Sequence, residues 1–433
     1  MRSIEKKMAQ TQKKSDYKWI IIALCFLMVF TTLGFCSSNK GLYLSAITDA
    51  LGIKRSVFSI GDSCRYVTTA IVNLFFGSLV SRYGTRRLIA AGFGCLIASC
   101  LVYAVGTQVW MFYIAGALLG MGLSWTTTTM VGCVVGRWCK ENKGTVMGAI
   151  LCANGLGGAL AAQIVSPIIY EEGKPFGYRT SYFLVAVILL AVGIIVVALF
   201  REAPKVSDVQ KTQEGSTKSS KKARGQGWIG MEFGEAIRKP YFCPAAICIF
   251  FTGLMLQGIT GVAAAHMKDV GLDASFVATV VSVHALSLAA FKFLTGVMYD
   301  RFGLRITMSI CDVAAVLIMV ILATLNGSGT GQVMALVYAV LSSIALPLET
   351  IMLPIFANDL FGDKPYEKVM GLFVSVNTAG FAVGSPLMNW TFDRFGTYRP
   401  IFLVCAVIMI AVLIIFQFIL NAAQKCKDEI MRQ

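Results

Sequence analysis

Charged residues are scarce in this sequence: they make up 14% of its 433 positions, whereas a soluble chain carries about a quarter. Two histidines are present, and none of the thirteen cysteines stands in a CxxC pair, so we interpret the cysteines as small apolar residues of helices. The sequence contains no metal-ligand cluster, nucleophile elbow or phosphate-binding loop. These absences predict a protein that is not an enzyme and that needs no metal or cofactor.

The sequence is instead rich in long apolar segments. Hydrophobic residues make up 56% of the chain, and the mean hydropathy is +0.71. Blocks such as 19–35, 182–200 and 401–420 each approach the ~20 residues that a membrane-spanning helix needs. The first block follows a polar tail and has no small-residue cleavage site after it, so we expect a retained span rather than a signal peptide. The sequence therefore predicts an all-α membrane protein.

The apolar blocks divide into two sets of six. We expect twelve transmembrane helices, at about 17–46, 56–80, 87–107, 109–136, 143–169, 179–200, 240–267, 274–299, 304–325, 331–357, 367–391 and 398–420. Between the sets, the polar run KTQEGSTKSSKKARGQG lacks the apolar residues that a folded core requires. The predicted domains are a cytosolic tail (1–16), two six-helix bundles (17–200 and 240–420), a basic cytosolic linker (201–239) and a second cytosolic tail (421–433).

The positions of lysine and arginine predict the orientation. The formal net charge is +15, and 28 of the 38 lysines and arginines fall on the side of the N-terminus, with seven on the opposite side. The positive-inside rule then places both termini in the cytosol, with the protein in the cytoplasmic membrane. This distribution accounts for the positive charge without a nucleic-acid partner. Three cations remain inside predicted helices, Lys40, Arg65 and Lys292, and charges at such depth are typical of functional sites.

The two halves of the chain repeat each other. GSLVSRYGTRR at 77–87 returns as GVMYDRFGLRI at 296–306, with its glycines 219 positions further on. A parallel duplication of this kind predicts a substrate site between the halves and a rocking motion of one half against the other. The repeated basic turns are also expected to latch one conformation on the cytoplasmic side. The residues of this cytoplasmic latch would be Asp300, Arg301, Arg305, Arg82 and Arg86.

These turns resemble those of the major facilitator superfamily, and the resemblance covers nearly all of residues 17–420. RWCKENKGTVMG (137–148) looks like the loop after helix 4 in monocarboxylate transporters and oxalate/formate antiporters. GFCSSNKGLYLSAI (34–47) is similar to helix 1 of the monocarboxylate branch. The resemblance implies the major facilitator fold and secondary active transport of small carboxylate anions by alternating access. Such a carrier would function as a monomer, coupled to protons or by anion exchange.

Lys292 is the first candidate for substrate binding. It lies seven residues before Tyr299, where the apolar run ends, which places it about 10 Å inside the hydrocarbon edge. In the family that the sequence resembles, a cation four residues before the helix 8 glycine pairs with the substrate carboxylate, and Lys292 stands four residues before Gly296. The alternative is a side chain that reaches back to the cytosol. Leu288 occupies the place of an acid found in some animal members, so no proton route is inferred there.

Lys40 and Arg65 are the other two intramembrane cations. Lys40 falls on the helix 1 lysine of the monocarboxylate branch, so the resemblance implies a role in binding. Its position in the outer third of the helix also allows the side chain to reach the outer interface. Arg65 follows Asp62 by three residues, where a local ion pair competes with a role in attracting anions to the outer mouth.

Two titratable residues are candidates for proton coupling. His284 lies eight residues before Lys292 on the same broad face of its helix, where the alternative is a structural hydrogen bond. Glu349 lies between two prolines in a helix that lines the cavity of this fold, so it is a candidate proton carrier or lysine partner. Further residues that we expect along the cavity are Tyr43, Tyr66, Trp125, Asn154 and Asn377.

The sequence thus predicts a secondary transporter of small carboxylate anions. Lys292, together with Lys40, would neutralise the anion in a cavity of low dielectric constant. The expected partners are this anion, the lipid bilayer and, in a symport, protons. An efflux carrier for other organic compounds is the main alternative, and a membrane sensor without transport is the second.

Overall fold

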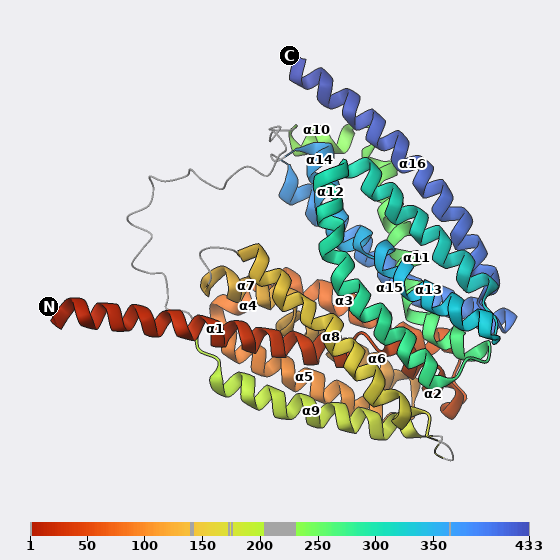
Figure 1. The fold of residues 1–433 in the computed structure, drawn as a ribbon, viewed down its shortest axis with the longest axis horizontal. Helices are drawn as coiled ribbons and strands as arrows, with labels where there is room; N and C mark the ends of the chain where they lie inside the picture. Colours follow the sequence, from red (N-terminus) through yellow and green to blue (C-terminus); the bar gives the residue numbers. More distant parts are fainter. Residues whose placement is uncertain are drawn as a thin grey trace.

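The computed structural model describes residues 2–138, 143–171, 174, 176–202, 231–362 and 365–432, and nearly all of them are helical (Figure 1). These residues contain no β-strand, as an all-α fold requires. The predicted linker lies mostly outside them, from 203 to 230. The first half of the chain forms α1 (Arg2–Cys36), α2 (Lys40–Leu51), α3 (Arg55–Leu74), α4 (Phe76–Tyr83), α5 (Thr85–Val105), α6 (Val109–Thr126), α7 (Thr128–Trp138), α8 (Lys143–Ile169) and α9 (Gly177–Leu199). The second half forms α10 (Phe233–Arg238), α11 (Phe242–Asp269), α12 (Ala274–Thr324), α13 (Gly329–Ala345), the π-helical turn η1 (Leu348–Met352), α14 (Leu353–Phe361), α15 (Tyr366–Phe395) and α16 (Arg399–Arg432).

Ten of the described helices are long and apolar enough to cross a membrane, or eleven when α3 and α4, which meet at 61°, form one bent span. α12 has 51 residues, about 75 Å at 1.5 Å per residue, or more than twice the ~30 Å of the hydrocarbon core. It changes direction at Gly303, whose φ of 78° favours glycine. If α12 is counted as two spans and α3 with α4 as one, the described residues hold twelve candidate spans. α16 continues to Arg432, past the end predicted at 420, and α1 begins at Arg2, before the start predicted at 17.

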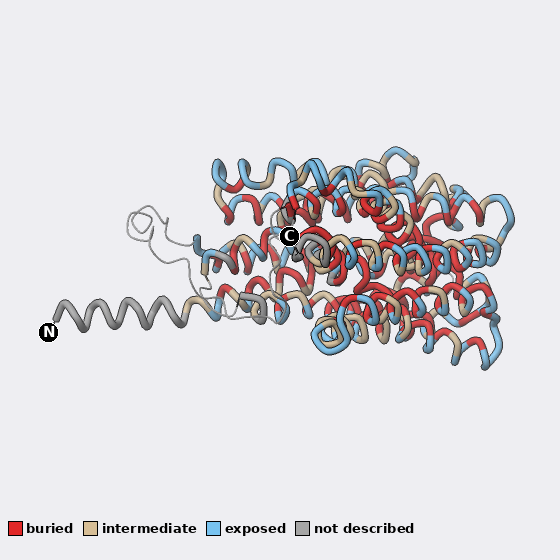
Figure 2. Tube along the Cα trace, turned by 90° about the horizontal axis from the view of Figure 1, so that it is seen from above, coloured by how far each residue is buried: buried red, intermediate tan, exposed pale blue. Residues whose placement is uncertain are grey.

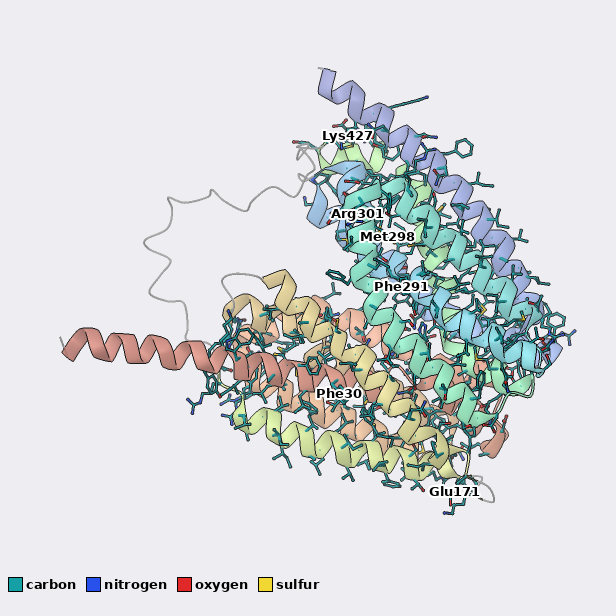
Figure 3. All side chains as sticks on the ribbon, in the orientation of Figure 1. Phe30, Glu171, Phe291, Met298, Arg301 and Lys427 are labelled. Carbon is teal, nitrogen blue, oxygen red and sulfur yellow. The ribbon has the colours of Figure 1, made fainter. Side chains whose placement is uncertain are left out.

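The helices form two bundles that meet at one end of the molecule. In Figure 1, α1 to α9 lie below and α11 to α16 above. The bundles converge where α2 approaches the ends of α11 and α13, and they diverge toward the end that carries α4, α7, α10 and α14. Across the boundary, α3 packs against α15 and α8 against α12. Figure 3 places Glu171 at this convergent end, and Arg301 and Lys427 at the divergent end.

Small residues allow close helix pairs inside each bundle. A Cβ atom added at Gly157 of α8 would lie 2.1 Å from the carbonyl oxygen of Phe30 on α1, and one added at Gly34 would lie 2.5 Å from the backbone of Gly157. In the second half, a Cβ added at Gly380 of α15 would lie 2.4 Å from the carbonyl oxygen of Phe250 on α11. α1 therefore packs on α8 as α11 packs on α15, which agrees with the internal repeat.

Burial separates the inside of the bundles from their outer faces. Buried residues gather between the helices, and exposed residues lie on the outside (Figure 2). The exposed positions include many large apolar side chains, among them Ile194, Phe418 and Val407, which are 62 to 67% exposed. Apolar outer faces on helices of spanning length are typical of surfaces that contact lipid.

Gly157→Ala should weaken the packing of α1 on α8, because the added methyl group has no space beside Phe30. Overpacking of this kind costs roughly 1–3 kcal/mol, so we expect a lower temperature of thermal unfolding for the purified protein in detergent. Gly94→Ala is the control, since no atom lies within 4 Å of a Cβ added at Gly94. Equal unfolding temperatures for the two variants would contradict the close contact.

Candidate functional site

A cavity of about 220 Å³ lies between the two bundles. Its walls come from α2, α3 and α8 of the first bundle and from α11, α12, η1 and α15 of the second. The charged residues and the histidine that line it are Lys40, Asp62, Arg65, His284, Lys292 and Glu349. All three cations that the sequence places inside predicted helices therefore reach one cavity.

The first span is interrupted beside this cavity. Three residues separate the end of α1 from the start of α2 at Lys40. In the interruption, Asn39 donates a hydrogen bond from Nδ2 to the carbonyl oxygen of Gly34 (3.0 Å), and the Ser38 hydroxyl donates to Asn154 Oδ1 on α8 (3.0 Å). These bonds hold Lys40 in the first turn of α2, where the helix dipole adds positive potential.

Two cations share one carboxylate on this wall. The ammonium group of Lys40 forms an ion pair with Asp62 of α3, and Arg65 Nε lies 3.9 Å from the same Oδ1 atom. Arg65 is also held from another side, because its Nη1 donates to Ser37 Oγ at 2.9 Å and its guanidinium lies 4.2 Å from the ring centre of Tyr66. The group therefore carries a formal charge of +1 when all three residues are ionised.

Lys292 lies on the opposite wall, which also carries His284 and Glu349. It lines the cavity from α12 and forms no hydrogen bond or ion pair with another residue in the part of the chain that the structure describes. Its neighbour Phe291 lies further from the divergent end than Met298 and Arg301 do (Figure 3). A half-buried ammonium at this depth, without a protein partner, leaves its charge available to an anion in the cavity.

Glu349 is a buried acid of the cavity wall that lacks a hydrogen-bond partner at one oxygen. It lies in the π-helical turn η1, an irregularity that is frequent at functional sites. Its side chain is 8% exposed, and Oε1 has no hydrogen-bond partner. It faces the central cavity and also a second cavity of about 20 Å³, which Thr252 and Asn377 line. A buried carboxyl without a partner is costly when ionised.

His284 reaches the cavity, but one of its ring nitrogens is committed to structure. Nδ1 lies 2.7 Å from Ser342 Oγ and 3.3 Å from the carbonyl oxygen of Ala339, both on α13. These contacts fix the orientation of the ring against α13 and leave Nε2 as the only ring nitrogen for exchange with the cavity.

Of the five other residues that the sequence predicts along the cavity, two line it and three do not. Tyr66 and Asn154 line it. Tyr43 instead lines an adjoining cavity of about 40 Å³, where its hydroxyl is 2.7 Å from Ser181 Oγ. Neither Trp125 nor Asn377 lines the central cavity: the Trp125 indole nitrogen is buried without a partner, and Asn377 faces the smaller cavity beside η1.

The basic turns at the divergent end show no latch in this conformation. Arg86 Nε donates to the carbonyl oxygen of Val197 (2.8 Å), and Arg305 Nε donates to Gln417 Oε1 (2.7 Å), each within its own bundle. Among the described residues, Asp300 forms no ion pair within 4.0 Å with Arg301, Arg305 or any other cation, and the guanidinium of Arg82 lies 5.4 Å from the ring of Tyr83. The cytoplasmic latch remains a prediction for a conformation in which these turns meet.

Arg55 joins the bundles at the convergent end. From the first turn of α3, its Nη1 and Nη2 donate to the two carboxylate oxygens of Asp269 on α11, at 2.5 and 2.8 Å, and its guanidinium stacks 4.0 Å above Phe392 on α15. Asp393 of α15 accepts hydrogen bonds from the backbone N–H groups of Arg55 and Ser56, at 3.1 and 2.9 Å. A residue of the second bundle therefore caps a helix of the first.

Sequence reasoning missed two parts of this arrangement. It paired Asp62 with Arg65 and did not assign Asp62 to Lys40, although the polar run SSNK inside an apolar block (37–40) is a signal of a helix interruption. Arg55 is one of the seven lysines and arginines that the sequence places on the outer side, and no local pattern indicates partners more than 200 positions away.

Two similar bundles around a charged central cavity define a membrane transporter fold. The sequence profile of the Major Facilitator Superfamily matches residues 22–262 and 245–429, and the chain belongs to this superfamily. Among relatives, the chain is 25% identical over 295 residues to the uncharacterized MFS-type transporter YcxA of Bacillus subtilis, covering 67% of each chain. It is 27% identical over 195 residues to the 4-hydroxybenzoate transporter PcaK of Pseudomonas aeruginosa, covering 44% of this chain and 41% of PcaK.

Two further relatives are the agnestins efflux protein AgnL12 of Paecilomyces divaricatus, at 21% identity, and the fujikurins efflux protein of Gibberella fujikuroi, at 23% identity. The fold is similar to that of the nucleoside transporter NupG in its D323A mutant form, with a TM-score of 0.76 and 13% identity over 92% of this chain and 99% of that one. The similarity to NupG concerns the fold alone. The chain is thus a major facilitator transporter with a multi-pass membrane architecture.

Asp393→Ala should loosen the junction at the convergent end, because the first turn of α3 loses its cap. Loss of an N-cap costs about 0.5–2 kcal/mol, so hydrogen–deuterium exchange of the first α3 amides should speed up several-fold. Asp49→Ala is the control, since Asp49 is 70% exposed and lies 3.9 Å from Arg55 Nη2. Unchanged α3 exchange in Asp393→Ala would contradict a capping role.

Proposed function

We propose that this protein is a secondary transporter of small carboxylate anions, in line with the resemblance of its sequence to the monocarboxylate and oxalate/formate branch. The observation that carries the proposal is the unpartnered ammonium of Lys292, which lines the same cavity as two further cations, Lys40 and Arg65, of the other bundle. With Glu349 ionised, the five charged residues of the cavity sum to +1. An anion is the ligand that such a cavity stabilises best.

Snorkelling is the competing explanation for Lys292, and its position argues against it. A lysine that only escapes the membrane extends toward headgroups on the outside of a bundle. Lys292 instead lines the cavity between the bundles, together with Lys40 and Arg65 of the other half. Charges in membrane segments that face a cavity are typical of ligand pathways.

Alternating access follows from the two ends of the molecule. The convergent end is held shut by Arg55, Asp269 and Asp393, while the bundles diverge toward the other end (Figure 1). The distribution of lysine and arginine favours the cytosol for the divergent end. In this interpretation the cavity opens to the cytosol, and rocking of the bundles would open it to the outside.

Proton coupling, if the carrier uses it, is better supported at Glu349 than at His284. Glu349 lines the same cavity as Lys292, and its buried Oε1 has no hydrogen-bond partner. His284 uses Nδ1 for contacts with α13. A proton on Glu349 would leave the charge of Lys292 for the substrate, and its loss would restore a negative partner close by. Anion exchange needs no such proton.

An efflux carrier for other organic compounds is the alternative, because some relatives are named as efflux proteins. A cavity with three cations and two acids favours an anion over a neutral or cationic drug. The relative named as a transporter of 4-hydroxybenzoate, a carboxylate, supports the same direction. The carboxylate assignment is therefore the function that the site supports best.

Lys292→Ala should abolish uptake of carboxylates by proteoliposomes while the protein still folds and inserts, because the anion loses its partner on one wall. We expect at least a tenfold loss of initial rate across a panel of radiolabelled monocarboxylates and dicarboxylates. Lys174→Ala is the control, as Lys174 is 64% exposed and pairs with Glu171 outside the cavity. Uptake by Lys292→Ala at the wild-type rate would contradict the assignment of Lys292 to substrate binding.

Glu349→Gln tests the proton route. If Glu349 carries the proton, an acidic outside buffer should accelerate uptake by the wild-type protein several-fold, and the amide variant should lose this response because it cannot titrate. His284→Asn is the matched variant: its amide can still donate to Ser342, and it should keep the response. A Glu349→Gln variant that responds to the gradient as the wild type does would exclude Glu349 as the carrier.

A further inference from the structure

Asp62 places a carboxylate of the protein where a carboxylate substrate would bind. It pairs with Lys40, and its Oδ1 lies 3.9 Å from Arg65 Nε. All three side chains line the central cavity. The ion pair is partly accessible, with side chains 20 and 23% exposed for Lys40 and Asp62, so a ligand in the cavity can reach it.

The two cations differ in how they depend on Asp62. Arg65 has further partners in Ser37 Oγ and the Tyr66 ring, and its side chain is 7% exposed. Lys40 has Asp62 as its partner, and no second hydrogen bond or ion pair of its ammonium is found within the described ranges. A substrate carboxylate that binds Lys40 must therefore compete with Asp62, while Arg65 stays in place.

The charge balance shows what the competition does. With Asp62 present, the group on α2 and α3 carries a formal charge of +1; without it, the same group carries +2. An uncompensated second cation in a cavity of low dielectric constant raises the free energy of the empty carrier and lowers that of the anion-bound one. Asp62 thus weakens anion binding and stabilises the empty state.

We infer that Asp62 is an internal counter-ion, which neutralises Lys40 in the empty carrier and is displaced from it when the substrate carboxylate binds. This inference rests on the proposed function. It makes Asp62 a positioning residue for the return of the empty carrier between its two faces. Net uptake requires this return step, whereas exchange of one substrate molecule for another does not, because the carrier then crosses loaded in both directions.

Asp62→Asn separates these two modes of transport. In proteoliposomes with labelled lactate and labelled succinate as probes, we expect the KM of the transported anion to fall about tenfold. Net uptake should slow at least tenfold, and exchange against internal unlabelled anion should stay within about twofold of the wild type. Asp62→Glu keeps the charge and should restore the wild-type ratio of net uptake to exchange. Glu171→Gln removes an exposed acid outside the cavity and should change neither mode.

The outcomes are distinguishable. A higher KM for Asp62→Asn, or an equal loss of exchange and net uptake, overturns the counter-ion role and leaves the proposed function standing. Failure of both anions to bind or enter with the wild-type protein overturns the proposed function, and the role of Asp62 with it. If Asp62→Asn does not fold, as judged by thermal unfolding and gel filtration, Asp62→Ser removes the same charge and is held to the same results.

Discussion

Compensation of buried positive charge is the constraint on which the centre of this molecule depends. A charge without a partner inside a helical membrane protein costs several kcal/mol, so each ammonium must find a carboxylate or face water. Lys40 finds Asp62 on the neighbouring helix. Lys292 lines the cavity and forms no ion pair with any described residue. The contacts between small and apolar residues elsewhere carry no comparable demand, so the cavity is where an added charge would change the energy of the protein most.

Interrupted helices make this arrangement possible. A break in a membrane helix leaves backbone groups without partners, and it is tolerated where side chains or a water-filled cavity supply them. The break before Lys40 uses Asn39 and Ser38 for this purpose. Near Glu349, Pro354 lacks the backbone N–H of a regular helix, and the preceding turn widens to a π-helix. Both irregular segments face the same cavity, and each presents a charged side chain to it.

The fold and the identity of the central charges were predictable from sequence, because both depend on properties that act along the chain. Hydropathy gives the spans, and depth within a span singles out Lys292. The partner of each charge was not predictable from sequence. The pairing of Lys40 with Asp62 depends on the break between α1 and α2, which the sequence analysis did not predict. Trp125 does not line the central cavity in this conformation, and the sequence could not indicate this: in a helix that is apolar all round, periodicity does not identify the inward side.

The two ends of the molecule must balance each other for such a carrier to work. Opening the convergent end breaks two charge-assisted hydrogen bonds between Arg55 and Asp269 and removes the cap that Asp393 provides. Bonds to charged groups contribute about 1.5–3 kcal/mol each, so the loss is large enough to trap the protein unless the divergent end gains similar contacts. The basic turns there, including Asp300 and Arg301, form no ion pairs with each other in this conformation, and they remain the predicted source of such contacts. In the proposed transport cycle, a ligand that contacts both walls of the cavity would need to supply only the difference in free energy between the contacts at the two ends.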